Sequence, residues 1–120
     1  MSLTNPVPKS FYYAFEGFKT AVKEEPNFRI HLTIATIALI LATVLGFALT
    51  EWLVLLFTIS LVLILELVNT SMEEIVNLVN PETHPLAKKA KDVMAAAVLL
   101  SAFIAIIIGF VLFLPKLILL

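Results

Sequence analysis

The chain has 120 residues, enough for one domain, and its formal net charge is −1. Hydrophobic residues make up 61% of it and charged residues 14%, and the mean hydropathy of +1.05 lies far above that of ordinary soluble domains. The absence of cysteine excludes disulfides, thiolate chemistry and cysteine-based metal sites. We therefore expect a single integral membrane domain over residues 1–120, with no nucleic-acid partner.

The first predicted element is an amphipathic surface helix over about residues 9–25, which Pro26 limits. Four apolar residues in this stretch recur at intervals of three or four and so share one helical face. They are Phe11, Phe15, Phe18 and Val22. Such a helix either lies along the cytoplasmic membrane interface or packs against the rest of the protein, and the two alternatives are compatible.

Three membrane spans follow, over about residues 29–50, 52–79 and 86–114. The first and third each contain an uncharged apolar stretch that is long enough to cross about 30 Å of hydrocarbon as a helix. Lysine and arginine residues gather before the first span and between the second and third, whereas the 46–52 turn contains neither. The positive-inside bias therefore predicts a cytoplasmic N-terminus and a cytoplasmic 80–91 loop.

The second span carries a polar stripe where the helix should still lie in the membrane. Glu66, Asn69, Glu73 and Asn77 follow one another at spacings that place them on a single helical face. If the outer boundary lies near Trp52, Glu66 is about 9 Å inside the opposite boundary. An ionisable side chain at such a depth costs up to about 2.5–3.5 kcal/mol and by default indicates function.

Several interpretations of the stripe remain open at this point. A solvated helix end with one snorkelling glutamate explains Glu73 and Asn77 but explains Glu66 poorly, and a purely structural scaffold leaves the buried carboxylate without a role. A small proton-coupled transporter would use Glu66, yet it needs a glutamate near mid-bilayer and leaves Lys91 and Asp92 unused. A site with two carboxylates would let one hold a divalent metal while the other accepts a proton.

Charged residues from other parts of the chain converge at the same depth. They are Glu24, Glu25, Lys88, Lys91 and Asp92. Carboxylates and lysines at a membrane surface suit a polyanion bound through a metal, such as a nucleoside triphosphate. The three glycines of the chain form neither a Walker loop nor a GxGxxG motif, so a nucleotide must be held by side chains and Mg²⁺.

Four stretches carry a family resemblance: "SFYYAFEGFKTA", "EEPNFRIHL", "ELVNTSMEEIVNLV" and "HPLAKKAKDVMAAAVLL". Together they resemble the bacterial integral-membrane diacylglycerol kinase family, which includes the undecaprenol kinases, over nearly the whole chain. The resemblance implies an all-α membrane protein with three transmembrane helices and an N-terminal amphipathic surface helix. It also implies a homotrimer in the bacterial cell membrane, whose cytoplasmic active sites combine neighbouring subunits and transfer the γ-phosphoryl of Mg-ATP to a lipid hydroxyl.

The resemblance further implies roles for individual residues. Glu66 resembles the catalytic base and Asn69 a residue that orients the reacting groups, while Glu25 and Glu73 resemble ligands of Mg²⁺. The nucleotide is expected to contact Tyr13, Glu25, Glu73, Asn77, Glu82, His84, Lys91 and Asp92. The lipid substrate is expected to contact Arg29, His31, Glu66 and Ala95.

Two positions depart from the family pattern. Asn77 stands where the family usually has Asp, and Met94 stands where a small residue is common. His31, taken alone, reads as an interfacial histidine at the start of the first span. The combination of "NFRIHL" with "HPLAKKAKD" resembles the undecaprenol kinase branch, so undecaprenol is the expected substrate and diacylglycerol the alternative.

Overall fold

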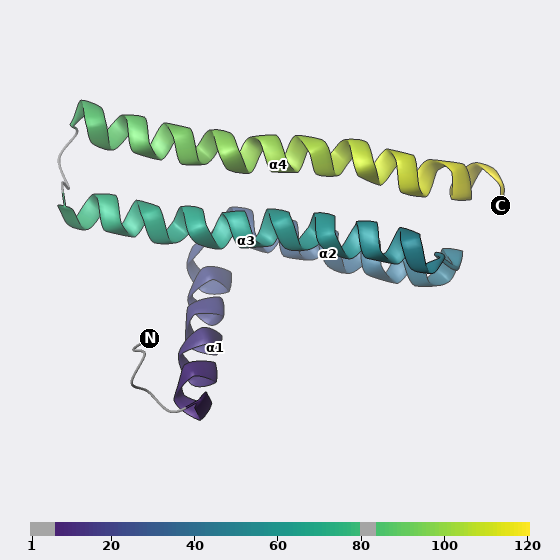
Figure 1. Ribbon diagram of the computed structural model, residues 1–120, viewed down its shortest axis with the longest axis horizontal. Helices are drawn as coiled ribbons and strands as arrows, with labels where there is room; N and C mark the ends of the chain where they lie inside the picture. Colours follow the sequence, from purple (N-terminus) through teal and green to yellow (C-terminus); the bar gives the residue numbers. More distant parts are fainter. Residues whose placement is uncertain (1–6, 80–83) are drawn as a thin grey trace.

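The computed structural model describes residues 7–79 and 84–120, and every element in these two ranges is an α-helix. The helices are α1 (Val7–Glu24), α2 (Pro26–Leu45), α3 (Leu49–Val79) and α4 (Pro85–Ile118). Each of α2, α3 and α4 is long and apolar enough to cross a membrane. The structure thus confirms an all-α protein with three candidate spans and an additional N-terminal helix (Figure 1).

α1 is amphipathic and runs crosswise to the three long helices (Figure 1). Its exposed side chains include Phe11 and Phe15, whereas Phe18 packs edge-to-face on Phe28 of α2 with ring centroids 5.3 Å apart. Phe28 is fully buried, so this aromatic contact anchors α1 to the start of the bundle. The crosswise orientation agrees with the surface helix that the sequence predicts.

The corner between α1 and α2 is formed by Glu25 and braced by Arg29. Glu25 has an extended backbone (φ −110°, ψ 102°), and Pro26 begins α2, where its missing N–H costs no helical hydrogen bond. Arg29 Nη1 donates hydrogen bonds to the carbonyl oxygens of Val22 and Lys23, both at 2.9 Å. These carbonyls belong to the last turn of α1, which lacks intrahelical donors, so a side chain of α2 completes the end of α1.

α2 ends at Leu45 rather than near residue 50 as predicted, because Gly46 adopts the left-handed conformation (φ 71°, ψ 51°). The N–H groups of Gly46 and Phe47 donate back to carbonyl oxygens of α2 at 3.3 and 3.1 Å, which is the Schellman arrangement. α3 begins shortly afterwards, and Glu51 Oε1 accepts a hydrogen bond from the Ala48 N–H at 2.8 Å. The 46–48 turn is therefore short and closed on both sides.

An aromatic cluster holds the end of α4 against this turn. Phe47 is buried and contacts the rings of Trp52 and Phe113, with centroid distances of 6.1 and 4.8 Å. Lys116 lies over the Phe47 ring at 5.9 Å and pairs with Glu51 at 3.1 Å. These contacts fix the axial position of α4 relative to the α2–α3 hairpin.

The three long helices differ in length, and the difference shapes one end of the bundle. α2 has 20 residues and is about 30 Å long, whereas the 31 residues of α3 and the 34 residues of α4 extend about 46 and 51 Å. α4 continues to Ile118, past the predicted end near residue 114. At the end where α1 joins the bundle, α3 and α4 project beyond the start of α2 (Figure 1). We call this the projecting end.

Gly46→Ala is expected to lower the free energy of unfolding by about 1–2 kcal/mol, since an L-residue in the left-handed conformation carries that backbone cost. A methyl group at this position meets no atom within 4 Å, so the effect isolates backbone strain. Thermal unfolding in detergent measures it. Gly17→Ala, in the regular part of α1 and with equally open surroundings, is the matched control and should leave the melting temperature unchanged or raise it. Equal losses in the two variants would contradict this account of the turn.

Candidate active site

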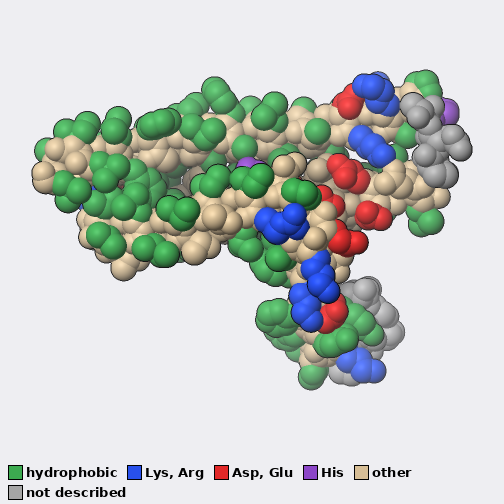
Figure 2. All heavy atoms as spheres, turned by 180° about the vertical axis from the view of Figure 1, so that it is seen from behind, with side chains coloured by type: hydrophobic (Ala, Val, Ile, Leu, Met, Phe, Trp, Pro, Cys, Tyr) green, Lys and Arg blue, Asp and Glu red, His purple; other side chains and the backbone are tan. Residues whose placement is uncertain are grey.

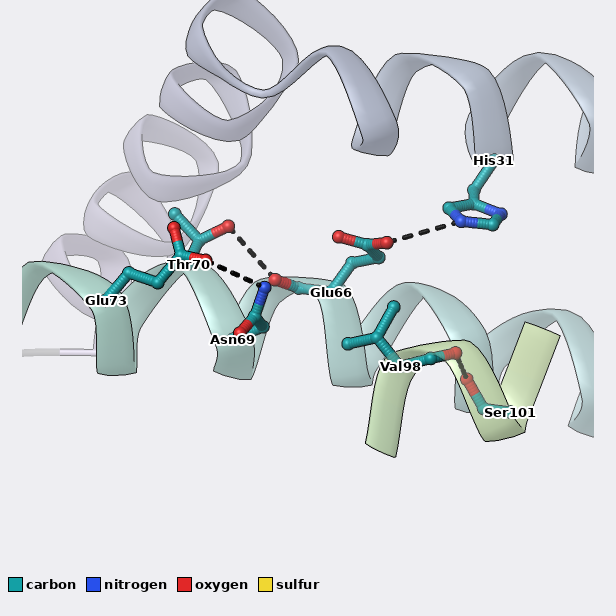
Figure 3. Close-up of polar contacts among 7 residues, drawn as sticks. All are labelled: His31, Glu66, Asn69, Thr70, Glu73, Val98 and Ser101. Atoms are coloured by element: carbon teal, nitrogen blue, oxygen red, sulfur yellow. Dashed lines mark hydrogen bonds and ion pairs between the residues drawn. The ribbon is translucent and has the colours of Figure 1, made fainter. Parts of the chain in front are cut away.

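Three polar side chains follow one face of α3 near the projecting end (Figure 3). Glu66 is buried, with 3% of its surface exposed, whereas Asn69 and Glu73 are half-buried. Asn69 Nδ2 donates a hydrogen bond to Glu73 Oε1 at 3.3 Å, as expected for neighbours on one helical face. Asn69 Oδ1 is enclosed and has no hydrogen-bond partner among the described residues.

Glu66 faces α2, where its carboxylate meets an imidazole (Figure 3). Glu66 Oε1 lies 3.2 Å from His31 Nε2, and the exposed fractions of the two side chains are 4% and 24%. A buried carboxylate requires a partner that offsets the loss of hydration. His31 provides that partner, and the pair joins α3, which carries the polar stripe, to α2.

The sequence named His31 and Glu66 separately as expected contacts of the lipid and did not predict the contact between them. A signal for it exists in the sequence. Ala42 of α2 and Leu55 of α3 share one core cluster, and counting eleven residues farther from the 46–48 turn along each helix leads to His31 and Glu66. Applying this count requires knowing that α2 and α3 form an antiparallel hairpin with a very short turn.

Glu25 lies at the α1–α2 corner, where the charges of the polar stripe affect its pKa. Burial raises the pKa of the Glu25 carboxyl most, and the negative charges of Glu73, Glu66, Glu74 and Glu24 raise this pKa further. Figure 2 shows acidic side chains gathered where α1 meets the bundle. The structure therefore brings together the two carboxylates predicted to bind a metal, Glu25 and Glu73, although they come from different elements.

The first turns of α4 add basic residues to the projecting end (Figure 2). Lys91 Nζ donates a hydrogen bond to Asn77 Oδ1 of α3, and Lys88 forms an ion pair with Asp92 one helical turn away. The amide of Asn77 accepts from Lys91 without neutralising it, so the ammonium charge is retained. Lys91 and Asp92, predicted to act as a pair, thus have separate partners in the structure.

The remaining residues expected at the nucleotide lie farther from the stripe or have local roles. His84 caps α4, with its Nδ1 accepting a hydrogen bond from the Leu86 N–H at 3.1 Å. Tyr13 is on α1, where its ring packs edge-to-face on Tyr12 with centroids 5.5 Å apart. Glu82 falls outside the described residues.

An apolar groove begins beside the His31–Glu66 pair. It has a cavity volume of about 390 Å³ and is lined by residues of α2, α3 and α4. Apart from His31 and Thr58, the lining side chains are apolar, so the groove suits a hydrocarbon chain. Two of the residues predicted to contact the lipid are elsewhere: the guanidinium of Arg29 is turned to the end of α1, and Ala95 is exposed on α4 outside the groove lining.

The carboxylates at the corner suit a magnesium ion that arrives with a nucleotide. Within residues 7–79 and 84–120, no group of three or more histidine or acidic side chains forms a complete metal cage. Mg²⁺ is commonly bound by one or two carboxylates together with substrate phosphates and water. Glu25 and Glu73 are the two carboxylates that the sequence assigns to the ion; burial is the main cause of the raised pKa of Glu25, and the charge of Glu73 raises this pKa further.

Comparison with known proteins adds independent information. The family model described as prokaryotic diacylglycerol kinase matches residues 12–113. Undecaprenol kinase of Bacillus subtilis is 40% identical over 109 residues, which cover 91% of this chain and 89% of that protein. Diacylglycerol kinase of Synechocystis is 44% identical over 109 residues, covering 90% of this chain and 62% of that protein. Diacylglycerol kinase of Escherichia coli (strain K12) is 30% identical over 99 residues, with coverages of 82% and 81%.

Glu25→Gln is expected to raise the melting temperature in metal-free buffer at neutral pH. A carboxyl whose pKa is raised in the folded protein stabilises the fold below its ordinary pKa, and that contribution is lost as the pH rises through the raised pKa. The wild type should therefore lose stability over this pH range, and the variant should lose less. Thermal unfolding across a pH series measures the difference.

Glu24→Gln is the matched control for this prediction, because it removes the same charge from the exposed neighbouring side chain. The control should keep most of the pH dependence of the wild type. If Glu24→Gln and Glu25→Gln flatten the pH profile equally, the pH dependence does not come from a raised pKa of Glu25.

Proposed function

Because this chain belongs to the prokaryotic diacylglycerol kinase family and is a multi-pass lipid kinase of a bacterial membrane, we propose that it phosphorylates undecaprenol at a site built around Glu66. ATP is the co-substrate that the kinase activity implies. The observation that carries the proposal is a buried carboxylate in contact with His31, which lines an apolar groove. A membrane alcohol that places its chain in the groove presents its hydroxyl to Glu66.

The same groove argues against the transporter alternative. A proton-coupled transporter needs polar groups along its path through the membrane. From His31 towards the 46–48 turn, the groove lining is apolar except for Thr58, whose hydroxyl is already donated to the Val54 carbonyl at 2.7 Å. The groove therefore provides no polar path from Glu66 to the opposite side of the membrane.

In the proposed reaction Glu66 is the general base. The O–H bond of the lipid alcohol breaks, its proton passes to the Glu66 carboxylate, and the alcohol oxygen forms a bond to the γ-phosphorus as the bond to ADP breaks. Asn69 would orient the reacting groups, with its amide nitrogen held by Glu73. Phosphoryl transfer depends mainly on positioning and charge neutralisation, which suits a site made of a few charged side chains.

The nucleotide is proposed to lie across the projecting end, between the carboxylates of the corner and the lysines of α4. Glu25 and Glu73 would hold the magnesium ion, which neutralises phosphate charge when bound. Lys91 and Lys88, which the sequence already placed at this depth, would offset the remaining phosphate charge. Tyr13, Asn77, Glu82, His84 and Asp92 remain proposed contacts of the nucleotide, as do Arg29, His31 and Ala95 for the lipid.

Undecaprenol is preferred over diacylglycerol because the Bacillus subtilis undecaprenol kinase combines 40% identity with alignment over 89% of its own length. The two diacylglycerol kinases combine 44% with 62% (Synechocystis) and 30% with 81% (Escherichia coli). A homotrimer with its active sites on the cytoplasmic side is part of the same proposal. Exposed apolar side chains along α2, α3 and α4 favour lipid or subunit contacts, and Lys and Arg side chains gather at the projecting end, as the positive-inside bias requires.

Glu66→Gln is expected to lower kcat for lipid phosphorylation by about 10²–10⁴-fold, the range of general-base contributions. Glutamine keeps the size of the side chain, so the KM for ATP and the oligomeric state should stay close to those of the wild type. Glu74→Gln, on the exposed side of the same helix, is the charge-matched control and should retain activity. A Glu66→Gln enzyme with wild-type kcat would refute the general-base role.

The lipid preference is tested by offering undecaprenol and diacylglycerol in the same detergent mixture with Mg-ATP. We expect a higher kcat/KM for undecaprenol, measured as transfer of radiolabelled γ-phosphate to each lipid. A higher kcat/KM for diacylglycerol would reassign the substrate while keeping the kinase. Absence of lipid-dependent ATP use with either alcohol would remove the proposed activity itself.

A further inference from the structure

We propose that His31 is a positioning residue for the general base, holding one oxygen of the Glu66 carboxylate so that the other oxygen meets the lipid hydroxyl. The inference rests on the lipid-kinase function proposed above and deepens it. From the sequence, His31 was expected only as a contact of the lipid; the proposal adds that it orients Glu66.

The geometry gives Glu66 one side-chain partner among the described residues, and that partner comes from another helix. His31 Nε2 is 3.2 Å from Oε1, while Oε2 has no hydrogen bond from the described part of the chain (Figure 3). On α3 itself, Asn69 and Glu73 are bonded to each other, and Thr70 donates to the backbone carbonyl of Glu66 at 3.0 Å. The orientation of the carboxylate is therefore set from α2.

No cation replaces His31 in this task within the described ranges. Arg29, two residues earlier on α2, directs its guanidinium to the carbonyls of Val22 and Lys23. Lys91 is bonded to Asn77 and Lys88 is paired with Asp92.

A glutamate needs such a restraint because several of its side-chain torsions rotate freely. Catalytic groups must be held within about 0.5 Å of the productive geometry, and a misplacement of about 1 Å costs on the order of 100-fold in rate. The imidazole is itself fixed, since it comes from a helix that starts at Pro26 and is anchored by buried Phe28. Its Nε2 lies against Oε1 and leaves Oε2 for the hydroxyl.

His31 also borders the groove that receives the hydrocarbon chain. The ring therefore contacts both the base and the space from which the alcohol approaches. The proton of the lipid hydroxyl still passes to Glu66, and the imidazole keeps its own proton throughout. Its proposed effect is on the alignment of the base, so removing it should lower kcat more than it changes the binding of ATP.

The test compares three variants of the full-length protein in the lipid-phosphorylation assay. His31→Leu removes the donor and should lower kcat by about 100-fold with the KM for ATP within twofold of wild type. His31→Gln offers an amide N–H in place of Nε2–H and should recover at least a tenth of the wild-type kcat. Thr36→Val removes a polar group from an exposed site on the same helix and should keep full activity. Wild-type kcat in His31→Leu, or no recovery in His31→Gln, would overturn the proposal.

A stability cycle tests the contact independently of catalysis. His31→Leu should lower the melting temperature in detergent, because it leaves a buried carboxylate without a partner. The same substitution in a Glu66→Gln background should lower it less. Equal shifts in the two backgrounds would overturn the contact. If the wild type phosphorylates no lipid alcohol while the shifts differ, the contact stands and the proposed function alone fails.

Discussion

The contact between Glu66 and His31 is the interaction on which the organisation of the site depends. A carboxylate that is almost fully enclosed in an apolar bundle loses its hydration, and a hydrogen-bonding partner must compensate that loss. Because the partner lies on α2, the base is fixed by the packing of two helices rather than by its own helix. The start of the groove adjoins this pair through His31, whereas α1 and its corner are held by Phe18 against Phe28 and by Arg29.

The candidate site lies where the longer helices α3 and α4 project beyond the start of α2. α2 is about as long as the hydrocarbon core is thick, whereas α3 and α4 are longer by about 16–21 Å. Both α3 and α4 project beyond the start of α2 at one end, and α4 also continues past the 46–48 turn at the other end (Figure 1). At the projecting end the side chains change from apolar to charged. In the proposed reaction a hydroxyl would approach Glu66 from the groove and a nucleotide would approach from water.

Sequence patterns predicted the helices well because each pattern is local. Hydropathy indicated the three spans, and residue spacing aligned Glu66, Asn69 and Glu73 on one face. Contacts between elements were not accessible in the same way. The hydrogen bonds of Arg29 to the end of α1, the bond from Lys91 to Asn77 and the partnership of His31 with Glu66 depend on how helices distant in sequence lie side by side. The end of α2 was misjudged because apolar residues continue past Gly46, while the left-handed backbone there stops the helix.

The short 46–48 turn has a consequence for the opposite end of the bundle. Along an α-helix each residue adds about 1.5 Å and 100° of rotation, so the length of the turn determines both the height and the direction at which Glu66 meets α2. The Schellman closure at Gly46, the backbone bond to Glu51 and the clamp of Lys116 over Phe47 keep that length constant. The helical phase of Glu66 relative to α2 is thus set at the opposite end of the bundle. A change in the length of this turn would shift Glu66 away from His31, although the turn contacts neither residue.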